Sequence, residues 1–90
     1  MAVTLYLPAV LAKLVDGGPV TAAGATVGEV VGEVAARYPV LASRLRDANG
    51  APYAFVTFYL NDEDIRLRGG FDAAVHDGDE LTVVPAIAGG

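Results

Sequence analysis

The stretch Thr26-Val27-Gly28-Glu29-Val30-Val31-Gly32-Glu33-Val34 is the clearest amphipathic helix in the sequence. Its four valines recur at i, i+3, i+4 and i+7, which places one apolar stripe along a helix. Thr26 precedes the stripe and Glu29 follows three residues later, the spacing of a capping box that begins a helix. Pro39 predicts the end of this helix, because proline disfavours helical backbone at the residue before it. A short further turn of helix is expected over residues 41–46.

Five segments around this helix are predicted strands, from their alternation, their β-branched and aromatic content or their flanking turns: residues 3–7, 20–22, 55–60, 63–66 and 81–84. The order is strand, strand, helix, strand, short strand, strand. With one main helix available, that helix is expected to cross one face of a mixed sheet of four to five strands. We therefore expect an α+β domain of the β-grasp type over residues 1–85, followed by a flexible Gly-Gly tail over residues 86–90.

The pleat of the strands divides their side chains between two faces. The side chains expected to face the helix are Leu5, Leu7, Val56, Phe58, Leu60, Leu81 and Val83. Those expected on the outer face are Thr4, Tyr6, Phe55, Thr57, Tyr59, Thr82 and Val84. An outer face with threonines and tyrosines but few charges is a candidate docking surface, although ordinary solvated faces of antiparallel sheets share this composition. The predicted partner-binding residues are Tyr6, Phe55, Tyr59 and Val84, with Asp79 and Glu80 as charged contacts.

The composition excludes several classes of function. The chain has 90 residues, of which 53% are hydrophobic, so it makes one small ordered domain. It has no cysteine, which removes disulfides, thiolate ligands and a cysteine nucleophile and is in keeping with a cytoplasmic location. A net charge of −5 disfavours nucleic acid as a partner and makes a basic protein surface more plausible, although solubility is the commoner reason for such a charge. No signal peptide and no apolar run of membrane-spanning length are recognisable.

The side chains offer little for catalysis. His76 is the only histidine and Ser43, on the expected helical turn, is the only serine, so a catalytic triad is not expected. The acidic turn Asp62-Glu63-Asp64 lacks the twelve-residue pattern of a calcium loop. Gly69-Gly70 is not followed by the lysine of a phosphate loop. We therefore expect neither an enzyme nor a resident metal or cofactor.

The last two residues, Gly89-Gly90, carry the remaining chemistry. Glycine is a poor residue for fixing a chain end, but it suits a terminus that threads a narrow slot and leaves its carboxylate unhindered. A floppy tail is the simpler interpretation. If an activating enzyme transferred AMP from ATP to that carboxylate, sulfide could displace the AMP and leave a thiocarboxylate. Gly90 is thus the candidate site of adenylation and thiocarboxylate formation, with Ile87, Ala88 and Gly89 as the residues a partner would recognise.

Two motifs resemble the ubiquitin-like sulfur-carrier proteins, a family that includes the thiamine sulfur carrier and the small subunit of molybdopterin synthase. Asp77-Gly78-Asp79-Glu80, then Pro85, then Ala88-Gly89-Gly90 is similar to the family's acidic glycine turn, proline and Gly-Gly ending. Leu60 to Arg66, with Gly69-Gly70 after it, resembles more particularly the actinobacterial sulfur carriers of cysteine biosynthesis. The similarity runs the whole length and is densest from Phe55 to Gly90.

The resemblance implies a carrier without catalysis of its own, bearing sulfur on Gly90 and loaded by an ATP-dependent activating enzyme. For the cysteine branch it implies a pyridoxal-phosphate-dependent cysteine synthase as acceptor and a zinc metalloprotease that releases the new cysteine. Relatives also feed enzymes that insert sulfur into secondary metabolites. Three alternatives remain open: a molybdopterin- or thiamine-branch carrier, a ubiquitin-like protein modifier, and a non-covalent β-grasp interaction domain.

Overall fold

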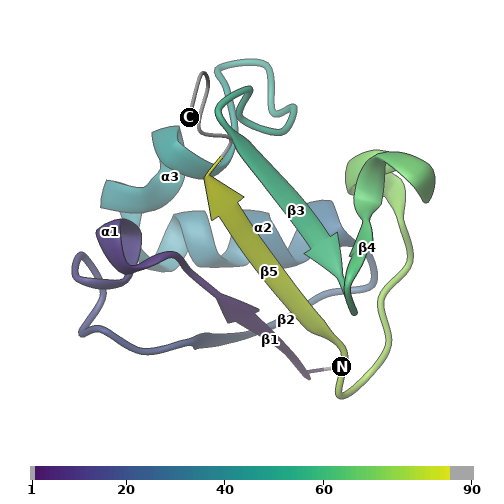
Figure 1. The fold of residues 1–90 in the computed structure, drawn as a ribbon, viewed down its shortest axis with the longest axis horizontal. Helices are drawn as coiled ribbons and strands as arrows, with labels where there is room; N and C mark the ends of the chain where they lie inside the picture. The colour runs from purple at the N-terminus through teal and green to yellow at the C-terminus, as the bar shows by residue number, and fades with distance from the viewer. Residues whose placement is uncertain (1, 86–90) are drawn as a thin grey trace.

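A mixed sheet forms one layer of the domain and the longest helix lies across it (Figure 1). The computed structural model describes residues 2–85. The strands are β1 (Ala2–Tyr6), β2 (Val20–Ala23), β3 (Val56–Leu60), β4 (Glu63–Asp64) and β5 (Glu80–Pro85). The helices are α1 (Ala9–Ala12), α2 (Val27–Arg37) and α3 (Pro39–Leu45), with two 3₁₀ turns, η1 (Ile65–Leu67) and η2 (Gly70–Asp72).

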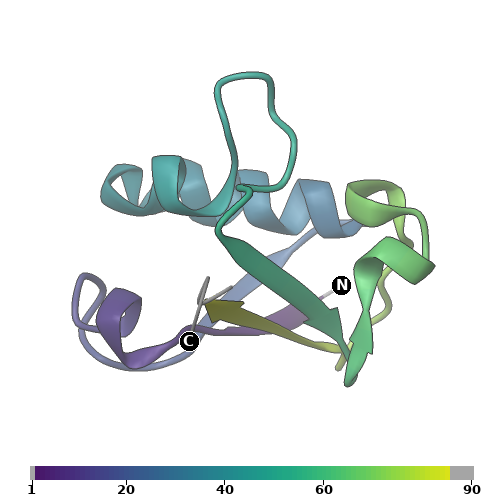
Figure 2. The same cartoon turned by 45° about the horizontal axis from the view of Figure 1, so that its top comes forward.

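The five strands lie in the order β2-β1-β5-β3-β4. The first and last strands, β1 and β5, are parallel neighbours, and the other neighbouring pairs are antiparallel. The long helix α2 crosses one face of this sheet, as Figures 1 and 2 show from two directions. This arrangement is the β-grasp fold, and it confirms the fold predicted from the order of the elements.

Helix α2 begins at the predicted cap, with one difference in detail. The Glu29 backbone N–H donates to Oγ1 of Thr26 at 3.2 Å, as a capping box requires. The Glu29 carboxylate accepts from the backbone N–H of Ala25 at 2.9 Å, one residue before the cap itself. Both contacts satisfy backbone donors around the helix start that the helix cannot pair internally.

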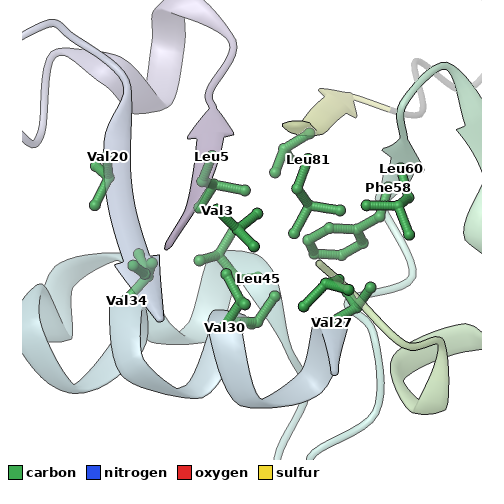
Figure 3. Packing of buried hydrophobic residues seen from close by; sticks show 14 of the residues in the cluster. Val3, Leu5, Val20, Val27, Val30, Val34, Leu45, Phe58, Leu60 and Leu81 are labelled. Atoms are coloured by element: carbon green, nitrogen blue, oxygen red, sulfur yellow. The ribbon is translucent and has the colours of Figure 1, made fainter. Parts of the chain in front are cut away.

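The core lies between α2 and the sheet. Val27, Val30, Val31 and Val34 are fully buried, so the predicted valine stripe faces the strands. Figure 3 shows the stripe meeting side chains from β1, β3 and β5, among them Leu5, Phe58 and Leu81. Of the side chains predicted to face the helix, five are buried: Leu5, Phe58, Leu60, Leu81 and Val83. The other two, Leu7 and Val56, are partly buried against the same core.

One helix was not expected from the sequence. Helix α1 follows Pro8, whose φ of −64° suits the residue before a helix and whose carbonyl accepts from the N–H groups of Leu11 and Ala12 at 2.9 and 2.8 Å. Leu11 and Val15, four residues apart, are each 5% exposed and fasten the segment to the core. This anchoring holds a helix too short to be stable alone.

Several predicted boundaries shift by one or two residues, and three of the shifts have a local cause. Helix α3 starts at Pro39, since proline is favoured in the first turn of a helix. Strand β3 starts at Val56, because Phe55 lies in the turn before it. Strand β4 ends at Asp64, whose Oδ1 accepts from the Arg66 N–H at 2.9 Å and begins η1. The extended segment expected over residues 63–66 is therefore half strand and half 3₁₀ turn.

Within residues 2–85, no helix combines the length and apolar character needed to cross a membrane. The predicted tail, residues 86–90, lies outside the described residues.

Candidate functional site

The predicted reactive residue, Gly90, and the predicted recognition residues Ile87, Ala88 and Gly89 lie outside the described residues. The structure does describe Pro85, which ends β5 and from which they follow. Pro85 is the register partner of Val56, at the end of the sheet where β3 begins. Pro85 also lines a surface hollow together with Arg44 of α3.

The outer sheet face brings together three of the predicted partner-binding residues. Thr82 of β5 is the register partner of Tyr6 on one side and of Tyr59 on the other. Val84 lies one step further along the same face of β5, opposite Thr57. Tyr6 and Val84 are 39% and 38% exposed, so this row offers aromatic and aliphatic surface to a partner.

Phe55 lies at the edge of this surface and belongs to a different feature. Its ring is 60% exposed and packs edge-on against Tyr53, with the ring centroids 5.4 Å apart. Phe55 also lines a hollow of about 200 Å³ that includes Pro8, Val10 and Pro85. The structure thus places Phe55 next to the point where residues 86–90 begin.

The two predicted charged contacts, Asp79 and Glu80, lie at the opposite end of β5 from Pro85. The Asp79 carboxylate accepts from Nδ2 of Asn61 at 3.0 Å and from the His76 backbone N–H at 2.7 Å. These hydrogen bonds, chiefly the one from Asn61, hold the pKa of Asp79 below its ordinary value. The Asp79 carboxylate therefore stabilises the fold, because it is already hydrogen-bonded within the domain.

Of the two predicted charged contacts, Glu80 is the more accessible. The residue is exposed, and its Oε2 accepts from the Tyr6 hydroxyl at 3.4 Å. This contact links Glu80 to the row of Tyr6, Thr82 and Tyr59. A partner seated on that row would therefore meet one negative charge at its border.

The remaining polar side chains form no catalytic arrangement among the described residues. The side chain of His76 is 75% exposed, with Nδ1 3.8 Å from Oδ2 of Asp79. In the acidic turn, Glu63 pairs with Arg68 and Asp64 with Arg66, whose guanidinium lowers the pKa of Asp64. Residues 2–85 contain no group of three or more histidine, cysteine or carboxylate side chains that could hold a metal ion.

The hollow beside Pro85 was not predicted from the sequence. Its wall includes Val10 from α1 and Arg44 from α3, two elements that were unpredicted or predicted with other bounds. A signal was present in Pro8-Ala9-Val10-Leu11-Ala12, where a proline precedes residues compatible with a helix. That signal locates a helix but not the side chains that face it from β3 and β5.

Comparison with known proteins assigns the chain to a family. The ThiS family model matches residues 7–90. The sulfur carrier protein CysO of Mycobacterium tuberculosis is 41% identical over 93 residues, covering 100% of both chains.

Two solved structures match closely. A chain in the crystal structure of the Amycolatopsis orientalis BexX/CysO complex is 42% identical with a TM-score of 0.87, covering 98% of this chain and 99% of that one. SAMP1 of Haloferax volcanii, a small archaeal modifier protein, is 27% identical with a TM-score of 0.83, covering 100% of both chains. The chain is therefore a member of the ThiS family, with the ubiquitin-like β-grasp fold of these carriers.

Proposed function

We propose that this protein is a sulfur carrier whose Gly90 carboxylate becomes a thiocarboxylate. A carboxylate is a poor electrophile, and transfer of AMP from ATP, with release of pyrophosphate, converts it to an acyl-adenylate with a good leaving group. Sulfide then attacks the carbonyl carbon and displaces AMP, leaving –C(O)S⁻ on Gly90. The chain acts as a cosubstrate, and the catalysis belongs to the activating enzyme.

The observation that carries this proposal is the 41% identity with the mycobacterial sulfur carrier, which covers 100% of each chain. The alignment thus spans residues 89 and 90. The polar side chains among residues 2–85 form no catalytic arrangement of their own. A protein of this kind needs a rigid body that partners recognise and a terminus that enters their active sites.

The outer face of the sheet is suited to recognition by a partner. We propose that the activating enzyme docks on the row of Tyr6, Tyr59 and Val84, with Phe55 at its edge. Aromatic side chains at such positions are the usual anchors of protein interfaces. Glu80 is proposed to steer a basic partner surface, with a smaller contribution from Asp79 because its carboxylate is already hydrogen-bonded.

The sulfur is proposed to go to cysteine or to another sulfur-containing metabolite. The acceptors consistent with this are a pyridoxal-phosphate-dependent cysteine synthase, with a zinc metalloprotease for release, or an enzyme that inserts sulfur into a secondary metabolite. The related Amycolatopsis chain is in complex with a second protein, BexX, which supports a dedicated protein partner here. A molybdopterin- or thiamine-branch acceptor is the alternative within the family.

Protein modification is a second candidate function. The observation that favours it is the similarity to SAMP1, which is named a modifier and matches over 100% of both chains. A modifier would use the same acyl-adenylate but transfer Gly90 to a lysine, forming an isopeptide bond.

The experiment that separates these functions is an intact-mass measurement on the protein isolated from the cells that make it. A mass increase equal to replacing one oxygen by sulfur at Gly90 selects the carrier. Branched peptides that join Gly90 to lysines of other proteins select the modifier. An unchanged mass, also after incubation with ATP, sulfide and candidate activating enzymes, would contradict both and leave a non-covalent interaction domain.

A further inference from the structure

The hollow beside Pro85 is lined mainly by apolar side chains, together with one cation, Arg44. Two of the lining residues, Val10 and Phe55, are 58% and 60% exposed. Arg44 is exposed and lines the same hollow, and among residues 2–85 it forms no ion pair. A groove with apolar walls and a guanidinium at the rim fits a short apolar segment that carries a negative charge.

We propose that the chain's own last residues, 86–90, fold back onto this hollow when no partner holds them. In this docked state the Ile87 side chain packs between Val10 and Phe55. The terminal carboxylate or thiocarboxylate of Gly90 pairs with Arg44. The ion pair rests on the proposed function, since it needs a free terminus at Gly90, but the Ile87 contact does not.

The length and composition of residues 86–90 suit this place. Pro85 is itself part of the lining, so the segment starts at the rim of the hollow. Ile87 is two residues further on, a reach of about 7 Å, and Gly90 is five residues on, a reach of about 17 Å. Ile87 is also the one large apolar residue of the segment. Its burial would cover apolar surface that is otherwise in contact with water.

A docked tail has a consequence for the carrier. Any enzyme that uses the terminus must capture the fraction of molecules whose tail is undocked, so its apparent affinity falls by that fraction. A partner that contacts Phe55 from the sheet face would displace Ile87 and release the tail where it is needed. Docking would therefore couple recognition of the domain to delivery of the terminus.

The first test is solution NMR on the full chain with labelled Ile87 methyl groups. Docking predicts nuclear Overhauser effects from these methyls to the Phe55 ring and the Val10 methyls, unchanged on dilution. Random-coil Ile87 shifts without such effects would overturn the proposal. Effects seen only between labelled and unlabelled molecules in a mixed sample would also overturn it, because the occupant would then be a second copy.

The second test is the rate at which a carboxypeptidase removes Gly90, because the protease must also wait for the undocked tail. We expect Phe55→Ala and Arg44→Gln each to speed removal about fivefold or more, a change of about 1 kcal/mol. The matched controls are Leu67→Ala, a 76% exposed residue after β4, and Arg46→Gln, which lines a separate hollow with Ala42 and Asp47. Equal rates in variants and controls would overturn the proposal.

Neither test uses ATP or an activating enzyme. A chain that shows the Ile87 contacts but never acquires sulfur would retain the docking and refute the carrier function. A chain that acquires sulfur normally but shows no Ile87 contact would support the carrier function and refute the docking.

Discussion

The side chain of Asn61 joins two turns that are 18 residues apart, because its Nδ2 donates to Oδ1 of Asp79 at 3.0 Å. Its Oδ1 accepts from the Glu80 backbone N–H at 2.9 Å, and its own backbone N–H donates to the Glu80 carbonyl at 2.8 Å. Asn61 also has a φ of +49°, a conformation that asparagine tolerates better than most residues. One side chain thus fixes the β3–β4 turn to the start of β5, the strand that leads to the terminus.

Asn61→Gly keeps the left-handed backbone and removes the side-chain hydrogen bonds, and its comparison with a second glycine substitution corrects for the added freedom of the unfolded chain. We expect the free energy of unfolding to fall by about 1–2 kcal/mol, the usual range for lost hydrogen bonds of this kind. Urea denaturation measures it. Asp62→Gly is the matched control, since Asp62 also has a positive φ, of 72°, but shows no side-chain hydrogen bond within residues 2–85. Similar losses in both variants would refute the linking role.

The lowered pKa values of Asp79 and Asp64 predict loss of stability in acid. Each carboxyl binds its proton less readily in the folded chain than in the unfolded one, so the unfolded state takes up more protons as the pH falls. Their contribution is present above the ordinary value of 3.8 and disappears as the pH drops through the folded-state values. Urea titrations between pH 7 and pH 2 should show this decline, with Asp79→Asn showing less of it. An identical pH profile in Asp79→Asn would contradict the assignment.

The sheet face is tested at Tyr59. Truncating an aromatic anchor can cost about 2 kcal/mol, so Tyr59→Ala should raise the activating enzyme's apparent KM for the carrier roughly thirtyfold. Leu67→Ala, which truncates an exposed apolar residue of η1 and not of the sheet, should leave the KM unchanged. Glu80→Lys should have a smaller effect that depends on salt, since surface charges act mainly on encounter.

Folded alanine variants of Tyr6, Phe55 and Tyr59 that are activated normally would place the dock elsewhere. The acidic turns around Asp62 and Asp77 would then be the next surfaces to test.

Gly89→Ala should impair activation and leave folding intact. A methyl group at this position would clash in a channel shaped for glycine, whereas residue 89 lies beyond the last strand of the domain. We expect the adenylation rate to fall while the thermal midpoint stays that of the parent protein. Adenylation of Gly89→Ala at the parental rate would refute the close-fitting channel.

Local patterns predicted most of the fold. The valine stripe with Thr26 and Glu29 specified α2. The β-branched and aromatic content around Phe58 specified β3, and the turn before Leu81 with the proline after Val84 specified β5. These patterns predict secondary structure because they depend only on residues close together in the sequence. Helix α1 escaped prediction because its four residues carry no side-chain cap and depend on burial of Leu11 and Val15 in the core.

The candidate site was predictable only in part, because its parts meet through tertiary contacts. The outer row of Tyr6, Tyr59 and Val84 followed from strand alternation. The hydrogen bonds of the Asp79 carboxylate could not be predicted in the same way. An acidic turn is expected to be exposed unless the structure shows that Asn61 lies beside it. The hollow at Pro85 was equally hidden, because Arg44 and Phe55 come from separate elements whose bounds differed from those predicted.

The most direct test of the carrier function is mass spectrometry of the C-terminal peptide after incubation with the cognate activating enzyme, ATP and sulfide. We expect the replacement of one oxygen by sulfur to be confined to Gly90. It should be absent without ATP, and absent from folded variants that lack Gly90 or carry one residue after it. Normal sulfur loading of either variant, or sulfur on a residue other than Gly90, would contradict the role of Gly90 as the sulfur-bearing terminus.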